Sequence, residues 1–180
     1  MIEVRIHGRG GEGVKSCAEI LGKAAFLSGF YTQDFSLYGA ERRGAPVVSF
    51  VRIDEKPILE RGYITKPDII LILDDTFEMG RMLKGSSEKT VVIINTSRAK
   101  KLGIDKKKNF IYLDATSIAL ETIGKPIPNT VMLGVLIKVL DGKIDFHNLE
   151  LAIEEKLSKY PKNIIDANKE AAKKGYGSYG

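Results

Sequence analysis

The sequence contains a single cysteine, Cys17, and no tryptophan among its 180 residues. One cysteine cannot form a disulfide within the chain, and it cannot supply the thiolates of an iron–sulfur cluster. The two histidines, His7 and His147, stand far apart and give no metal-ligand spacing. No apolar run reaches the roughly 20 residues of a membrane-spanning helix, and the first residues do not read as a signal peptide. These absences predict a cytoplasmic protein with no membrane partner.

The charge is positive but dispersed. The formal net charge is +5, and the lysines of residues 84–108 and 156–174 are interspersed with acids. This arrangement is typical of solvated helix faces. No strand combines aromatic and basic residues as RNA-binding modules do, so we expect no nucleic-acid partner. Apolar residues make up 43% and charged residues 28%, which favours a globular domain over a disordered chain.

Hydrophobic periodicity predicts alternating strands and helices. Residues 2–7 alternate apolar and polar side chains with period two, and from Val14 the period changes to that of a helix. Further apolar segments predict strands at 30–35, 47–53, 69–73, 90–94 and 110–113, and helices at about 116–123, 129–140, 149–157 and 164–174. No repeat or linker divides the chain. We therefore expect residues 1–180 to form a single layered α/β domain, with a Rossmann-like, mostly parallel sheet flanked by helices.

A glycine-rich loop joins the first strand to the first helix. Gly8, Gly10 and Gly13, with Gly11 between them, match the spacing G-x-G-x-x-G. Such glycines permit a tight turn and close helix–sheet packing. They also suit an anion or phosphate at the helix N-terminus. A third interpretation is a site for NAD or FAD, in which Asp34 would be the ribose-binding acid. These three interpretations stay open on the sequence alone.

Three local predictions concern single residues. Residues 74–76 (DDT) are expected to cap a short helix that reaches Leu83, and Asn129 is expected to cap the helix that follows Pro128. Cys17 falls on the apolar stripe of the first helix, so we expect it in the core.

Three segments together resemble one protein family. They are residues 7–13 (HGRGGEG), 39–46 (GAERRGAP) and 128–134 (PNTVMLG). Their order and spacing resemble the gamma subunits of pyruvate or 2-oxoisovalerate ferredoxin oxidoreductases, and the similarity covers nearly the whole chain. Glu12 stands where the family typically has glutamine.

The resemblance implies a division of labour within an enzyme that converts a 2-oxoacid, coenzyme A and oxidised ferredoxin into acyl-CoA, CO₂ and reduced ferredoxin. The substrate it implies is pyruvate. Thiamine diphosphate and magnesium then lie between alpha and beta subunits, and iron–sulfur clusters lie in beta and in a ferredoxin-like delta subunit. This chain binds no cofactor alone, carries no catalytic residue and completes the complex. The alternative is a stand-alone Rossmann-like protein that binds NAD or FAD.

Arg42 and Arg43 lie in a glycine-bounded loop, and guanidinium groups bind phosphates and carboxylates in a bidentate manner. With Gly8, Gly10, Gly11 and Gly13, they are the candidate site residues. Their expected role is contact with an anion, with coenzyme A or with a neighbouring subunit.

Overall fold

The computed structural model describes residues 1–37, 44–104 and 107–179, and its strands form one sheet in the order β2-β3-β1-β4-β5-β6. β1, β4, β5 and β6 pair in parallel, whereas β3 runs antiparallel to both β1 and β2. The bounds are β1 (Ile2–Arg9), β2 (Tyr31–Ser36), β3 (Pro46–Asp54), β4 (Ile69–Ile72), β5 (Val91–Asn95) and β6 (Phe110–Leu113). The predicted α/β fold with a mostly parallel sheet is confirmed.

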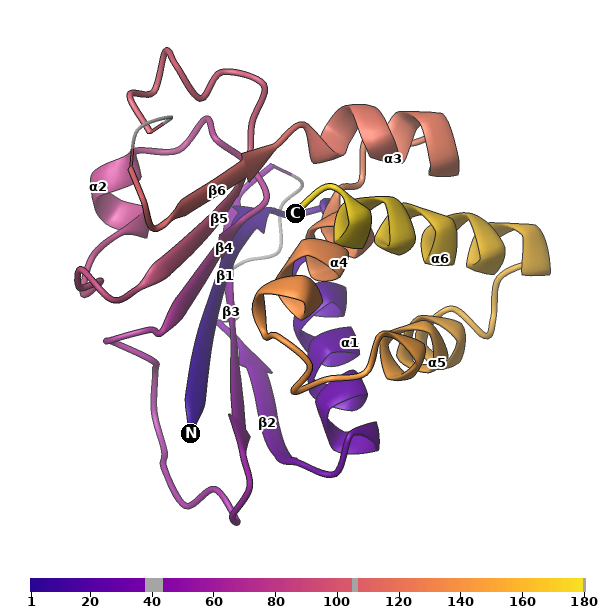
Figure 1. The fold of residues 1–180 in the computed structure, drawn as a ribbon, viewed down its shortest axis with the longest axis horizontal. Helices are drawn as coiled ribbons and strands as arrows, with labels where there is room; N and C mark the ends of the chain where they lie inside the picture. Colours follow the sequence, from indigo (N-terminus) through magenta and orange to yellow (C-terminus); the bar gives the residue numbers. More distant parts are fainter. Residues whose placement is uncertain (38–43, 105–106, 180) are drawn as a thin grey trace.

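The long helices lie together on one face of the sheet (Figure 1). The bounds are α1 (Val14–Leu27), α2 (Met79–Met82), α3 (Ala115–Ile123), α4 (Asn129–Val139), α5 (Phe146–Lys156) and α6 (Lys162–Gly177). α1 and α4 contact the sheet directly, whereas α5 packs on α1, and α6 packs on α3 and α4. The short α2 lies on the opposite face (Figure 1). The two faces are therefore covered in different ways.

Two apolar clusters stabilise these layers. The larger lies between the sheet and the long helices and includes the fully buried Cys17, as predicted. The smaller lies on the other face, where Ile70 and Ile72 of β4 pack against Met82 of α2 and Ile104. Because β4 and β5 are covered on both faces, they are apolar at every position from Ile69 to Ile72 and from Val91 to Ile94. That is the usual composition of strands inside a parallel sheet.

β1 alternates between the two faces. Val4 and Ile6 point into the helix-covered core, while Arg5 and His7 lie on the other face. Arg5 is only 7% exposed, and its Nη2 donates to the carbonyl oxygens of Met82 at 2.8 Å and Lys84 at 2.7 Å. Within the described part of the chain, no buried side-chain nitrogen or oxygen lacks a partner. The buried Arg5 is thus satisfied by backbone carbonyl groups at the end of α2 and in the turn that follows it.

Two of the local predictions were wrong. α2 begins at Met79, not after residues 74–76, because the Asp74 carboxylate accepts the Thr76 N–H (2.8 Å) and closes a local turn. Asn129 is the first residue of α4, not its cap, since Pro128 already has helical backbone angles and has no N–H to satisfy. The Asn129 side chain accepts the N–H of Thr130 instead, at 2.9 Å.

The closest helix contact joins α4 and α6 through two glycines. A Cβ atom on Gly134 would lie 1.9 Å from the carbonyl oxygen of Ala172. A Cβ atom on Gly175 would lie 2.0 Å from the carbonyl oxygen of Val131. In both cases the obstacle is backbone, so only glycine permits the helices to approach this closely.

We expect Gly134→Ala to lower the free energy of unfolding by at least about 2 kcal/mol, because the two helix backbones must separate. Gly175→Ala should have a similar effect. Gly177→Ala is the matched control, because a Cβ atom there meets nothing within 4 Å and the φ is not positive. It should change the stability by less than about 0.5 kcal/mol. Urea unfolding measures all three, and a Gly134→Ala protein as stable as the wild type would contradict the packing.

Candidate functional site

The glycine loop makes the turn from β1 into α1. Gly11 and Gly13 have φ values of 103° and 78°, a region that disfavours side chains with a Cβ atom. Gly13 directly precedes α1, and its carbonyl oxygen accepts the N–H of Cys17 at 2.8 Å. The loop is therefore glycine-rich for conformational reasons at these two positions.

Close packing accounts for Gly8. A Cβ atom there would lie 2.7 Å from Val14 Cγ2 and 3.1 Å from Leu73 Cβ. A Cβ atom on Gly13 would likewise lie 2.4 Å from Asn129 Nδ2, so this glycine also admits the start of α4. These contacts support the packing interpretation of the loop.

The mouth of the loop holds a carboxylate. Glu12 folds back so that its Oε2 accepts the N–H of Arg9 at 2.6 Å, and this oxygen would lie 2.8 Å from a Cβ atom on Gly8. The pKa of Glu12 is raised, chiefly by burial; the Arg9 N–H bond lowers it and the charge of Asp74 raises it. An incoming phosphate would meet this acid at the helix N-terminus. The geometry therefore disfavours a phosphate site within the loop itself.

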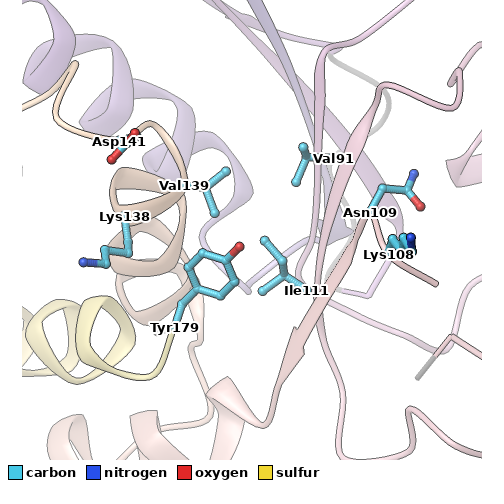
Figure 2. Close-up of a pocket in the computed structure, with 8 residues that line it drawn as sticks. All are labelled: Val91, Lys108, Asn109, Ile111, Lys138, Val139, Asp141 and Tyr179. Atoms are coloured by element: carbon cyan, nitrogen blue, oxygen red, sulfur yellow. The ribbon is translucent and has the colours of Figure 1, made fainter. Parts of the chain in front are cut away.

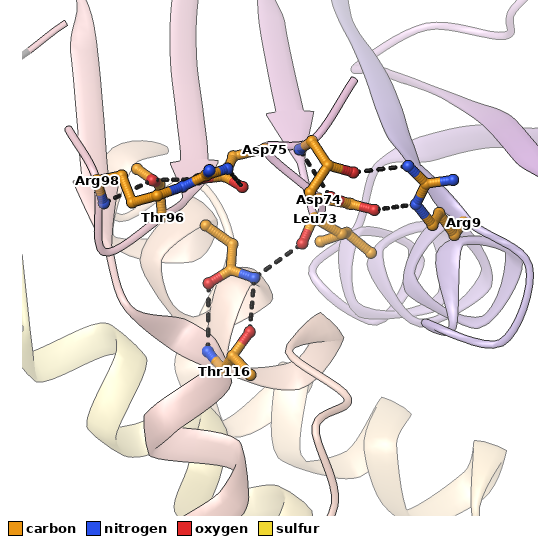
Figure 3. A network of polar contacts seen from close by, with 9 residues as sticks. Arg9, Leu73, Asp74, Asp75, Thr96, Arg98 and Thr116 are labelled. Carbon is orange, nitrogen blue, oxygen red and sulfur yellow. Dashed lines mark hydrogen bonds and ion pairs between the residues drawn. The ribbon is translucent and has the colours of Figure 1, made fainter. Parts of the chain in front are cut away.

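Arg9 connects the glycine loop to the end of β4. Its Nε pairs with Asp74, its Nη2 donates to Thr76 Oγ1 at 2.6 Å, and its guanidinium carbon lies 4.3 Å from the centre of the Phe77 ring. Burial raises the pKa of Asp74, but the hydrogen bonds from Thr76 and Arg9 outweigh it, so the net pKa is lowered. Figure 3 shows Arg9 and Asp74 facing each other across adjacent strand ends.

A second set of polar contacts joins β4, β5 and the start of α3 (Figure 3). Asp75 accepts hydrogen bonds from Thr96 and Arg98. Asn95 Nδ2 donates to the Leu73 carbonyl oxygen at 2.8 Å and to Thr116 Oγ1 at 2.9 Å. The carboxyl ends of three neighbouring strands thus carry polar contacts at the edge where open α/β sheets usually bind ligands.

The two predicted glycine and arginine segments meet at this edge. Arg42 and Arg43 lie outside the described residues, but Gly44 and Ala45, which follow them, are placed. Gly44 donates its N–H to the Gly10 carbonyl oxygen at 3.1 Å and accepts a bond from Arg9 Nη1 at 2.9 Å. Gly10 also donates its N–H to the carbonyl oxygen of Ala45, at 2.9 Å. The loop that carries the two arginines therefore ends against the glycine loop.

Sequence reasoning missed Arg9, Asp75 and Arg98 as members of this edge. A usable signal was present: polar pairs directly follow two apolar strands, at 74–75 and 95–96. Since the carboxyl ends of adjacent parallel strands meet, those pairs had to lie near one another.

The strand order argues against a dinucleotide site. In that fold the second strand lies beside the first, which brings its terminal acid to the ribose. Here β3 separates β2 from β1, and the Asp34 side chain lies under α1, where it would be 3.0 Å from a Cβ atom on Gly22. Asp34 is therefore not positioned beside the glycine loop, and the NAD or FAD interpretation is not favoured.

A separate cavity of about 410 Å³ opens at the opposite edge, between the ends of β5 and β6 and the carboxyl ends of α4 and α6. Its lining is mixed in polarity; the Tyr179 hydroxyl reaches into it, while the ammonium group of Lys138 points away (Figure 2). It is lined by Val91, Lys108, Asn109, Ile111, Lys138, Val139, Asp141 and Tyr179. Its polar groups do not converge on a ligand position.

Comparison with known proteins identifies the family. Residues 3–178 match the family described as pyruvate ferredoxin/flavodoxin oxidoreductase. The chain belongs to this family. It is 44% identical to the pyruvate/ketoisovalerate oxidoreductases common subunit gamma of Pyrococcus abyssi, over 88% of each chain. The resemblance noted in the sequence is confirmed, and the chain is a gamma subunit of a 2-oxoacid:ferredoxin oxidoreductase.

Solved structures agree with this membership. The crystal structure of pyruvate oxidoreductase subunit PORC from Thermotoga maritima superposes with a TM-score of 0.82 at 37% identity, over 98% of this chain and 95% of that one. The 2-oxoglutarate:ferredoxin oxidoreductase of Magnetococcus marinus shares the fold, with a TM-score of 0.77 at 20% identity. The match covers 98% of this chain but only 30% of the Magnetococcus chain. In that protein the fold is one part of a much longer polypeptide.

The half-buried His7 should make the free energy of unfolding depend on pH. Its Nε2 accepts Arg5 Nε at 3.0 Å, and burial, with the charge of Arg5, lowers its pKa to about 4. The unfolded chain, with a pKa near 6.5, therefore binds the proton first as the pH falls. The stability that the fold gains from keeping His7 neutral is therefore fully present above about pH 6.5, and it is lost as the pH falls from 6.5 to 4. We expect a loss of up to about 2 kcal/mol between pH 7 and pH 5.

The variant His7→Gln keeps a hydrogen-bond acceptor but cannot be protonated, so it should lose less stability over this range. His147→Gln is the control, since that side chain is 71% exposed, and it should leave the profile unchanged. Urea unfolding at pH 7 and pH 5 gives the comparison. Equal acid losses in wild type and His7→Gln would show that His7 does not titrate as argued.

Proposed function

We propose that this chain, acting as one gamma-type domain over residues 1–180, completes a thiamine-diphosphate-dependent complex that oxidises pyruvate. The complex transfers the acyl group to coenzyme A and the electrons to ferredoxin. The observation that carries the proposal is the similarity, over most of the chain, to a gamma subunit named for pyruvate and ketoisovalerate and to a PORC subunit named for pyruvate. Alpha, beta and delta subunits are the proposed partners.

The cofactor chemistry must come from those partners. A cluster needs about four thiolates, whereas the chain has only Cys17, which is fully buried and whose pKa is raised by that burial. Among residues 1–37, 44–104 and 107–179, no group of three or more His, Cys, Asp or Glu side chains could hold a metal ion. This chain therefore does not fit an iron–sulfur cluster, and we assign it no catalytic residue.

We place the contact with the rest of the complex at the carboxyl edge of the sheet, through Arg42, Arg43 and the glycine loop of Gly8, Gly10, Gly11 and Gly13. Two observations support an intersubunit role over a phosphate pocket. Glu12 lies in the mouth of the glycine loop, and the backbone of Gly10 is bonded within the chain. Arginine side chains on the adjoining loop then supply donors to carboxylates of a partner.

We expect Arg43→Ala to weaken association with the alpha and beta subunits by at least about 30-fold, since losing one member of a desolvated charge pair costs about 2–5 kcal/mol. Arg81→Ala is the matched control, because Arg81 is 87% exposed and forms an ion pair with Glu78 on its own helix turn. Affinity is measured by titrating the labelled chain into the remaining complex, together with the KM for coenzyme A. Unchanged assembly and unchanged KM would contradict this role for the loop.

The isolated chain should fold but oxidise no 2-oxoacid. Decarboxylation needs an electron sink that side chains do not provide, and electron export needs metal centres. The assay is pyruvate-dependent reduction of a viologen dye, with thiamine diphosphate and coenzyme A supplied. Turnover by the chain alone, or an alpha–beta–delta complex that works equally well without it, would refute the proposal.

A further inference from the structure

The turn that follows the two arginines is held by three hydrogen bonds. Gly44 is exposed, and it is the first described residue after Arg43. Its N–H donates to the Gly10 carbonyl oxygen at 3.1 Å, and the Gly10 N–H donates to the Ala45 carbonyl oxygen at 2.9 Å. The third bond runs from Arg9 Nη1 to the Gly44 carbonyl oxygen, at 2.9 Å. Two of the bonds join backbone groups, whereas the third depends on where the Arg9 side chain lies.

The direction of that third donor is set on the other side of the guanidinium group. Arg9 Nε pairs with Asp74, Nη2 donates to Thr76 Oγ1 at 2.6 Å, and the guanidinium carbon lies 4.3 Å from the centre of the Phe77 ring. A guanidinium group is a rigid planar fork. Once Nε and Nη2 are bound on one side, the direction of Nη1 is therefore fixed as well. Asp74 and Thr76 thus decide whether Nη1 reaches Gly44.

Asp74 can serve as this anchor because the backbone before it is held firmly. The Leu73 N–H donates to the His7 carbonyl oxygen at 2.8 Å, which extends the parallel pairing of β4 with β1 by one residue. The Leu73 carbonyl oxygen accepts a bond from Asn95 Nδ2, also at 2.8 Å. The Asp74 side chain is only 10% exposed. A fixed point on the sheet is thereby connected, through the Arg9 side chain, to the turn after the two arginines.

The neighbouring carboxylate makes a different connection. Asp75 is 13% exposed, and it accepts hydrogen bonds from Thr96 and Arg98, which follow β5. Figure 3 shows the two acids directed to opposite sides, Asp74 toward Arg9 and Asp75 toward Arg98. The two aspartates therefore have similar burial, and each pairs with an arginine, but they hold different segments of the chain.

The pair of Arg9 and Asp74 is poorly placed to serve stability alone. Arg9 is 35% exposed, and ion pairs that reach solvent contribute little to folding. Its bonds to Asp74, Thr76 and Gly44 instead immobilise a long side chain beside the glycine loop. A surface that is ordered before it meets a partner loses less conformational entropy on association. The arrangement therefore suits recognition.

We propose that Asp74 is a positioning residue for the contact with the alpha and beta subunits. It acts through Arg9, whose guanidinium group holds Gly44, the residue bonded to Arg43. The inference rests on the proposed function, and it extends that function to a side chain that need not touch the partner.

The first test compares Asp74→Asn with Asp75→Asn in the full-length chain. Asparagine keeps the size of the side chain and removes its charge. Asp74→Asn should raise the Kd for the remaining complex about tenfold, within the range by which residues outside a binding site modulate it. Asp75→Asn should change the Kd less than about threefold, because its contacts are not shared with Arg9.

A second variant covers the same connection by a smaller change. Thr76→Val keeps the shape of the side chain and removes the acceptor of Arg9 Nη2, so it should also raise the Kd. The thermal midpoints of the three variants show that each folds. If Asp74→Asn does not fold, Thr76→Val carries the comparison with Asp75→Asn.

A double-mutant cycle with Arg43→Ala separates positioning from general destabilisation. If Asp74 acts by ordering the chain beside Arg43, much of its effect should disappear together with that side chain. In the Arg43→Ala background, Asp74→Asn should therefore raise the Kd by less than about threefold, since residues of one network are not additive. A purely structural role would instead give the full rise in both backgrounds, and would contradict the inference.

Amide hydrogen exchange tests the connection in the isolated chain, without the other subunits. Loss of the Asp74 carboxylate releases Arg9 Nη1 from Gly44, so the Gly44 and Gly10 amide protons should exchange faster. We expect an increase of at least about threefold in Asp74→Asn and no change in Asp75→Asn, measured by NMR.

Three other results would also overturn the inference. Equal exchange in Asp74→Asn and wild type shows that Asp74 does not hold the turn, whatever the complex does. Faster exchange with an unchanged Kd shows that association does not depend on the order of the turn, which leaves the proposed function intact. A wild-type chain that joins no complex removes the proposed function and the inference together.

Discussion

The alternation of side chains along β1 is the constraint on which the rest of the structure depends. One side of this central strand is apolar and meets the long helices, while the other carries Glu3, Arg5, His7 and Arg9. A buried charge without a partner costs several kcal/mol, so loops must supply partners. Two of these side chains fix distant parts of the chain: Arg5 fixes the end of α2 and the turn after it, and Arg9 fixes the end of β4. The loop side of the protein is organised from this strand outward.

The position of β3 explains why the glycine motif makes a tight turn here instead of a nucleotide site. The antiparallel strand β3 occupies the place beside β1 that the second strand takes in dinucleotide-binding folds. The glycine loop is then enclosed by β3 and by the turn at Gly44, and its glycines serve the turn and the close packing of α1 and α4. Glu12 completes this enclosure by bonding the N–H of Arg9. The spacing of the glycines therefore predicts the turn between β1 and α1, but it does not predict a bound nucleotide.

The sequence was informative wherever one local pattern decided the outcome. The strand Phe110–Leu113 and the start of α1 at Val14 agree with periodicity, because packing reinforces the local preference there. The order of the sheet could not be predicted, since it depends on β2 and β3 returning as a pair to the β1 edge. The role of Asp74 was missed for a similar reason: its ion-pair partner, Arg9, lies 65 positions away.

The two faces of the sheet thus suit different tasks. On the helix side, the backbones of α4 and α6 meet through Gly134 and Gly175, and this interlocked packing leaves little freedom for exchange of partners. On the loop side, polar and directional contacts surround a smaller apolar cluster, and each loop can present its own side chains without disturbing the main core. In the role that we propose, the subunit contributes through recognition and through the geometry it imposes on its neighbours. Because misplacement of about 1 Å at a reacting centre can cost about 100-fold in rate, a rigid helix layer behind well-anchored loops is the arrangement such a subunit requires.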